Sequence, residues 1–198
     1  MATIINASTS AGLVQTADTS GNLNLQSNGS TIVAVSSTGA AVTGTLSASG
    51  GVTVGATASP TFSAYRSASD GDQAITSATI TQILFPTERW DTNSNFASSR
   101  FTPTVAGYYL IYAAIDLGAS ANITAGSIWI NKNGSNFVPV YINTTSPSEA
   151  TFSITGVILF NGSTDYVEIK IRATGTSLVA HGADNDSTYF TASMIRSA

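Results

Sequence analysis

The chain has 198 residues, carries a formal net charge of −4 and contains no cysteine, which excludes disulfides and thiolate metal sites. Charged residues make up only 9%, against roughly 25% in an ordinary globular protein, while 42% hydrophobic residues argue against disorder. No basic cluster is present to bind nucleic acid, and no apolar run is long enough for a membrane-spanning helix, so neither partner is expected.

The first ten residues, MATIINASTS, contain neither a basic region nor an apolar core. Both are features of a secretory signal peptide, so we do not expect one here. The sequence therefore predicts synthesis and assembly in a cytoplasm.

Residues 1–59 form a region of their own, in which Asp18 is the only charged side chain. Short apolar pieces alternate with turn dipeptides such as Asn28-Gly29 and Thr38-Gly39, which predicts an arm of short β-strands. Strands this short and uncharged cannot build a core alone, so the arm is predicted to pack against other copies or a partner surface, with a flexible linker as the alternative. The residues expected to anchor it are Leu13, Val14, Leu23, Leu25, Ile32, Val33 and Val35.

Residues 60–198 contain longer strand patterns and no helical period. In the segment 123–132, Ile128 and Ile130 alternate with Trp129, as in a strand with one buried face. Eight to ten strands in this region predict an all-β antiparallel sandwich or jelly roll. Strands are expected at 61–66, 74–85, 100–105, 108–117, 123–132, 137–143, 150–160, 165–174 and 188–196.

The corner FTPTVAGYY, with Phe101, Pro103, Gly107 and Tyr109, resembles the strand-turn-strand corner of complement one-q and tumour-necrosis-factor-like domains. FSAYR and TYFTASMI are similar to the first and last strands of that family. The resemblance implies a homotrimer with an apolar threefold seam, although strand tyrosines also sit half-exposed in monomers because of their hydroxyl group. The residues expected in the seam are Tyr108, Tyr109, Tyr112, Tyr189 and Phe190.

The strings TADTSGNLNLQSNG and VTGTLSASGG, within residues 8–55, resemble the start of many tailed-bacteriophage virion proteins. The resemblance implies a structural protein on the outer surface of a virion, assembled in the host cytoplasm. A complement-type role is less favoured, because a collagen repeat and a secretion signal are both missing.

Within the virion class, the short arm favours a capsid decoration (cement) protein that binds the major capsid protein. A strip laid across capsid subunits needs little length, whereas a tail fibre needs length to reach a receptor. The alternative is a short tail or head fibre whose knob binds a glycan or protein of the host surface.

Catalysis has little support in the sequence. His181 is the only histidine, and with no nucleophile motif around it we expect an exposed loop residue. Asp184, Asn185 and Asp186 could ligate calcium, but the full pattern of a calcium-binding loop is absent, so a solvated turn is expected. The string DTSG at Asp18 occurs once, without the second copy that an aspartic protease needs. The chain is therefore predicted to be neither an enzyme nor a holder of a cofactor or metal.

Overall fold

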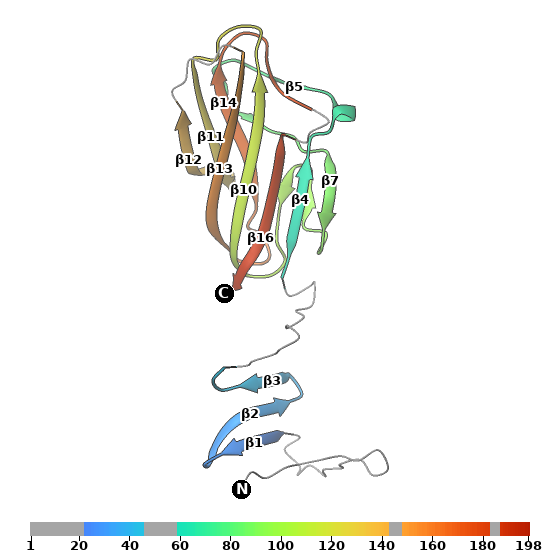
Figure 1. Ribbon diagram of the computed structural model, residues 1–198, viewed down its shortest axis with the longest axis vertical. Coiled ribbons are helices and arrows are strands. Elements are labelled where there is room, and N and C mark those ends of the chain that lie inside the picture. The colour runs from blue at the N-terminus through green and yellow to red at the C-terminus, as the bar shows by residue number, and fades with distance from the viewer. Residues whose placement is uncertain (1–21, 46–58, 143–147, 183–186) are drawn as a thin grey trace. The chain divides into compact units, whose positions relative to one another are not determined.

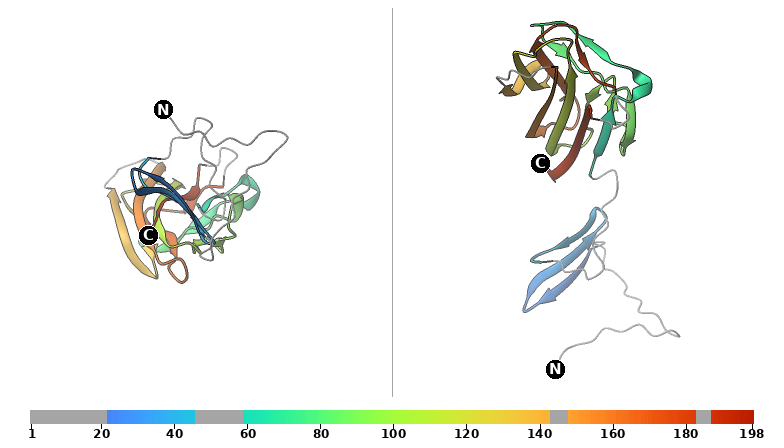
Figure 2. Two further views of the ribbon diagram at one scale, coloured as in Figure 1. Left: turned by 90° about the horizontal axis from the view of Figure 1, so that it is seen from below. Right: turned by 45° about the horizontal axis from the view of Figure 1, so that its top comes forward.

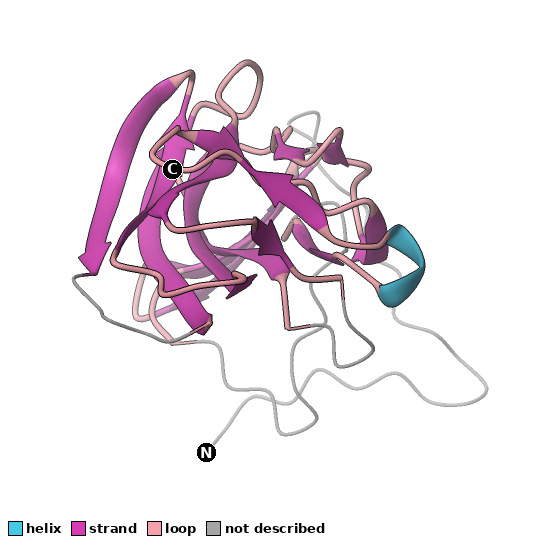
Figure 3. Ribbon diagram, turned by 90° about the horizontal axis from the view of Figure 1, so that it is seen from above, coloured by secondary structure: helices cyan, strands magenta, loops and turns pink. Residues whose placement is uncertain are grey.

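A computed structural model describes residues 22–45, 59–142, 148–182 and 187–198 of the chain. The chain divides into two compact units, Met1–Thr53 and Val54–Ala198. Within the described residues the regular structure is β-strand apart from one short 3-10 turn, Ala68–Asp70 (Figure 3). None of the helical structure described is long or apolar enough to cross a membrane.

The described part of the first unit is one antiparallel sheet of three strands (Figure 2). The strands are β1 (Leu23–Ser27), β2 (Ser30–Ser36) and β3 (Gly39–Val42). Asn28 and Gly29 both have positive φ, 50° and 78°, as a two-residue hairpin turn between right-handed twisted strands requires. The predicted arm of short strands is confirmed for these residues.

The second unit is a sandwich of two antiparallel sheets, and the first sheet is built around β10 (Gly107–Gly118). β13 (Glu149–Phe160) pairs with β10 along its whole length on one side. On the other side lie β16 (Tyr189–Ser197), then β4 (Thr61–Tyr65) and β7 (Thr87–Asp91) (Figure 1).

Two short strands extend this first sheet beyond the start of β16. β15 (Leu178–Ala180) pairs with the last two residues of β10, and β5 (Gln73–Ile75) pairs with β15. The same edge of β10 thus pairs first with β16 and then with β15.

The second sheet runs in the order β12, β11, β14, β9, β8, with β6 also pairing to β14. Its central strand β14 contributes Val167, Ile169 and Ile171 to the core, while Glu168 and Lys170 face outward beside Arg100. The strands of this sheet are β6 (Thr81–Gln82), β8 (Phe96–Ala97), β9 (Arg100–Phe101), β11 (Ala125–Lys132), β12 (Ser135–Ile142) and β14 (Val167–Thr174).

Aromatic rings join the two sheets. Phe62 of the first sheet stacks on Phe96 and Phe101 of the second, with ring centroids 4.6 Å apart in each pair. Phe190 meets Phe62 edge-on at 4.8 Å. Such ring pairs add to the stabilisation from apolar burial, so this end of the sandwich has a well-determined core. The predicted all-β jelly roll is confirmed.

Two of the expected strands are wrong in extent. The segment 74–85 is not one strand, because a turn with Ala78 at φ 60° separates β5 from β6. The segment 100–105 is a strand only over Arg100–Phe101, since Pro103 has no N–H for a ladder. The short strands β7, β8 and β15 were not predicted.

Candidate interaction surfaces

The outer face of the first sheet is apolar near the end of the sandwich where β10 begins. Tyr108 pairs across the strands with Leu159, and Leu110 with Val157, so all four side chains share one face. Their exposed fractions are 39% for Tyr108, 44% for Leu110, 56% for Val157 and 46% for Leu159. β16 adds Ile195, which is 58% exposed at a bulge opposite Tyr108. We call these five residues the apolar face.

Tyr109 and Phe190 are not on this face, so their predicted place in a subunit seam is wrong. Both are fully buried inside the sandwich. The Tyr109 hydroxyl donates a hydrogen bond to the Val105 carbonyl oxygen at 2.8 Å, and burial raises the pKa of Tyr109 to about 12. The reason is strand alternation, which turns Tyr109 inward where it turns Tyr108 outward.

Tyr108, Tyr112 and Tyr189 do lie on the outer side, and their seam role stays a prediction. The rings of Tyr112 and Tyr189 are 5.5 Å apart. A hydrogen bond with Tyr112, together with burial, raises the pKa of Tyr189. The Arg89 guanidinium lies over the Tyr65 ring at 4.4 Å, so the outer side of the first sheet near Tyr189 is aromatic and cationic rather than aliphatic.

The aliphatic residues of the apolar face were missed by the sequence analysis, which considered aromatic residues only. The signal was present in the alternation of GYYLIYAAIDL, because Leu110 has the same parity as Tyr108 and Tyr112. Once Tyr109 is known to be buried, that parity puts Leu110 outside.

The free edge strand β12 carries a second set of exposed apolar side chains. Phe137 is 56% exposed and Tyr141 is 71% exposed, and Tyr141 contacts Trp129 edge-on at 6.2 Å. A pocket of about 320 Å³ lies at the end of this edge, where Phe137 and Leu159 line it with Lys132. Since the pocket contains a residue of the apolar face, the two exposed apolar regions meet there.

The three-stranded sheet of the arm also has an apolar face. Leu23 pairs with Val35, Leu25 with Val33 and Val33 with Val42, so these five side chains lie on the same side. Among them Leu23 and Leu25 are 44% and 45% exposed. We call these residues the arm face.

Four of the predicted anchoring residues, Leu23, Leu25, Val33 and Val35, are thus brought together. Val42 was missed as their neighbour. Ile32, predicted with them, points to the opposite side of the sheet by strand alternation. Leu13 and Val14 lie outside the described residues.

Of the candidate metal and catalytic residues, only His181 lies within the described residues. Within residues 22–45, 59–142, 148–182 and 187–198, no group of three His, Asp or Glu side chains could hold a metal ion. His181 is not fully exposed as expected: its side chain is 29% exposed and its Nδ1 lies 3.2 Å from Asp72 Oδ1. Asp18, Asp184, Asn185 and Asp186 lie outside the described residues.

No protein-family model and no curated protein matches this sequence. Solved structures do match. Eiger TNF from S. frugiperda is 11% identical, covers 71% of this chain and 94% of its own, and has a TM-score of 0.52. The globular domain of zebrafish complement 1qA protein is 18% identical over 70% of this chain and 99% of its own, with a TM-score of 0.48. PRD1 vertex protein P5 is 14% identical over 69% of this chain and 97% of its own, also at 0.48.

The match to Eiger TNF confirms the predicted fold, a jelly roll of the tumour-necrosis-factor type. The match extends over 71% of this chain. We call the second of the two units, which contains the jelly roll, the knob.

Proposed function

We propose that the chain is a structural protein of a bacteriophage virion, most specifically a trimeric capsid decoration protein. Its jelly-roll knob forms a homotrimer through the apolar face, and its arm binds the major capsid protein. The observation that carries this proposal is the arm face, an apolar side of a charge-free sheet that the other described residues of the arm, within 22–45, do not cover.

An uncovered apolar sheet face is unfavourable in water, because each large side chain gains on the order of 1.5–3 kcal/mol when it is fully buried. The arm has no charged side chain in β1–β3 to keep it apart from other proteins. A capsid surface can cover the face and can pair by strand addition with the sheet edges at β1 and β3, which have no further strand among residues 22–45. The tailed-phage resemblance of residues 8–55 supports this choice of partner.

The apolar face of the knob supports the trimer in the same way. It presents aliphatic and tyrosine side chains from three adjacent strands, at the interaction surface that the one-q and tumour-necrosis-factor resemblance implies. A closed trimer buries this face on every subunit and leaves no open contact to which a further copy could add.

The test is co-sedimentation of purified protein with capsids stripped of it. Full-length protein should bind the capsids and raise their melting temperature, since a ligand that binds only the assembled shell stabilises it by mass action. Protein lacking residues 2–55 should remain soluble and folded but stay in the supernatant. Attachment of this truncated protein would assign anchoring to the knob instead.

The alternative function is a short tail or head fibre whose knob binds the host surface. The polar pocket described below favours it as a second candidate. Hundreds of copies per virion, counted by quantitative mass spectrometry, would support decoration, whereas a few tens or fewer would support the fibre. Failure of both protein forms to bind heads would favour the fibre as well.

A further inference from the structure

A polar pocket of about 510 Å³ lies on the outer side of the second sheet, at the edge formed by β8 and β9. It is bounded by β6, by the turn before β8 and by the residues after β9. Neutral polar side chains and one cation line it, with no carboxylate. The principal lining residues are Gln82, Ser94, Ser98, Arg100 and Thr102.

The wall of the pocket is firmly held. Asn95 is only 5% exposed, and its Nδ2 donates to Thr104 Oγ1 at 3.2 Å while its backbone oxygen accepts from the Thr102 N–H at 2.8 Å. Ser94 and Ser98 have positive φ, 54° and 51°, a conformation that non-glycine residues adopt at a cost and that concentrates at ligand sites. The pocket therefore has a defined shape before any ligand arrives.

Two neighbouring side chains fix the position of the Arg100 guanidinium and leave its other nitrogens available to a ligand. Its Nη2 lies 3.1 Å from Glu168 Oε2, and its guanidinium stacks over the Tyr166 ring at 3.8 Å. Glu168 is also paired with Lys170 at 3.0 Å, so two cations share one carboxylate and leave the cluster with an excess of one positive charge. Among the described residues, no other nitrogen of Arg100 has a hydrogen-bond acceptor.

The remaining lining groups are free to bind. The side chains of Gln82, Ser94, Ser98 and Thr102 make no hydrogen bond to any residue in the described ranges. They offer an amide and three hydroxyl groups, which match the closely spaced hydroxyl groups of a sugar ring. A second pocket, of about 320 Å³, shares Ser98 and adds the apolar side chains of Leu84 and Phe96, a suitable surface for the C–H face of a further ring.

We propose that this pocket binds a saccharide carrying a carboxylate, of the uronic or sialic acid kind. Arg100 receives the carboxylate, because a guanidinium presents paired N–H donors in the geometry of a carboxylate. The amide and hydroxyl groups receive the sugar hydroxyls. The source of the saccharide, the surface of a bacterial cell, rests on the proposed virion function, whereas the chemistry of the site does not.

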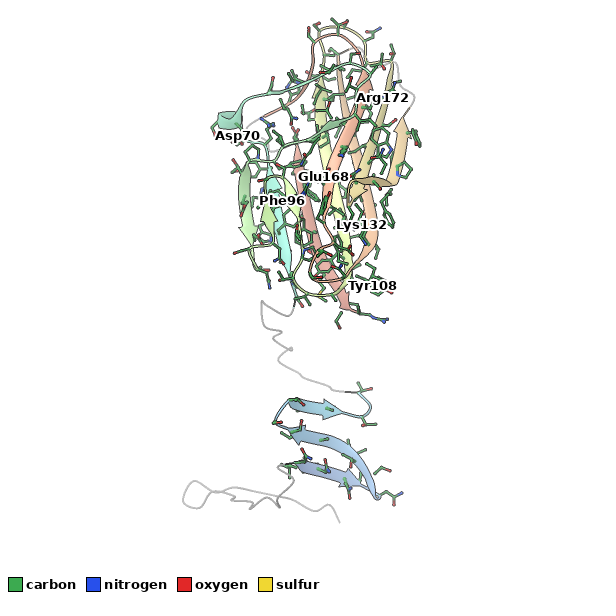
Figure 4. The ribbon with its side chains drawn as sticks, turned by 180° about the vertical axis from the view of Figure 1, so that it is seen from behind. Asp70, Phe96, Tyr108, Lys132, Glu168 and Arg172 are labelled. Carbon is green, nitrogen blue, oxygen red and sulfur yellow. The ribbon has the colours of Figure 1, made fainter. Side chains whose placement is uncertain are left out.

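The location of the pocket is compatible with a trimer. It lies on the second sheet, whereas the apolar face belongs to the first, so a seam built on the apolar face leaves the pocket open to a ligand. In Figure 4, Phe96 and Glu168 lie near the middle of the sandwich, whereas Tyr108 lies near one end of it.

The test presents full-length protein to an array of oligosaccharides containing uronic or sialic acids, with the carboxyl-reduced form of each as its matched neutral control. We expect at least one acidic saccharide to bind at least about tenfold more tightly than its reduced form, because the reduced form cannot make a charge-assisted bidentate pair with Arg100. The proposal is overturned if no acidic saccharide binds, or if acidic and reduced forms bind equally.

Three variants assign the binding to this pocket. Arg100→Lys keeps a cation beside Glu168 but removes the planar fork, and should weaken binding about tenfold with little change in melting temperature. Gln82→Ala should weaken it several-fold. Arg172→Gln is the control, because it removes one positive charge from the opposite end of β14 (Figure 4) and should leave affinity unchanged.

Unchanged affinity in both pocket variants would overturn the assignment. The same proteins should bind stripped capsids as wild type does. Wild-type protein that attaches to capsids but binds no acidic saccharide would contradict this inference alone. Wild-type protein that binds an acidic saccharide but not the capsids would contradict only the decoration function.

Discussion

Tyr109 contributes to the stability of the knob through both its ring and its hydroxyl. The ring packs edge-on against Phe160 at 5.3 Å, and the hydroxyl bonds to Val105 without access to water. Tyr109→Phe should lower the free energy of unfolding by about 1 kcal/mol, the net value of one buried hydrogen bond. Tyr109→Asp should prevent folding, because it buries an unpaired charge. Urea denaturation measures the first effect, and an unchanged midpoint would contradict it.

The same residue makes the knob sensitive to alkali. The folded pKa of Tyr109, about 12, is above the value of about 10 in an unfolded chain. The unfolded state therefore loses this proton first as pH rises, so stability is full below pH 10 and declines towards pH 12. Thermal melts between pH 9 and pH 12 should show a shallower decline for Tyr109→Phe than for wild type, and equal slopes would assign the alkaline loss to other groups.

Residue-level prediction from the sequence failed where two neighbours are chemically equivalent. Tyr108 and Tyr109 are identical side chains in one strand, and only the register with β13 and β16 decides which faces the core. The polar pocket was missed for a different reason. Gln82 and Arg100 are eighteen positions apart and meet only because both of their strands pair with β14.

At the scale of elements, the long strands were predictable and the short ones were not. β10 and β13 each run for twelve residues, and their alternation sets them apart from the surrounding chain. β7 has the sequence TERWD, in which charged residues hide the strand pattern, and β15 has only three residues. Such strands form because a neighbouring strand offers an edge, and that information is not local.

For the arm sheet, we predict that a charged substitution affects capsid attachment only on one side of β2. Val33 belongs to the arm face, whereas Ala34, the next residue, points to the opposite side. Val33→Asp should abolish co-sedimentation of full-length protein with stripped capsids, because it places a charge in the surface to be covered. Ala34→Asp is the matched control and should retain attachment. Equal behaviour of the two variants would remove the arm face as the anchor.

For the molecule as a whole, the proposed function divides between the two units. The knob has a complete core of its own, in which both sheets contribute aromatic and branched side chains. The arm sheet has no fully buried side chain among its described residues. A small sheet without buried side chains gains its stability from whatever covers it, which supports the proposal that the arm attaches and that the knob assembles and recognises.

The knob alone should therefore assemble without the arm. Residues 60–198 expressed on their own are expected to be a trimer by light scattering at micromolar concentration, with a melting temperature that rises with protein concentration. Val157→Glu should yield a folded monomer, because Val157 is 56% exposed in one chain and tolerates charge there but not in a seam. Val157→Thr, of nearly the same shape and uncharged, should remain a trimer. A wild-type knob that stays monomeric would contradict the predicted seam. A Val157→Glu variant that stays trimeric would instead place the seam on another surface. The next candidate is then the exposed edge strand β12, with Phe137 and Tyr141.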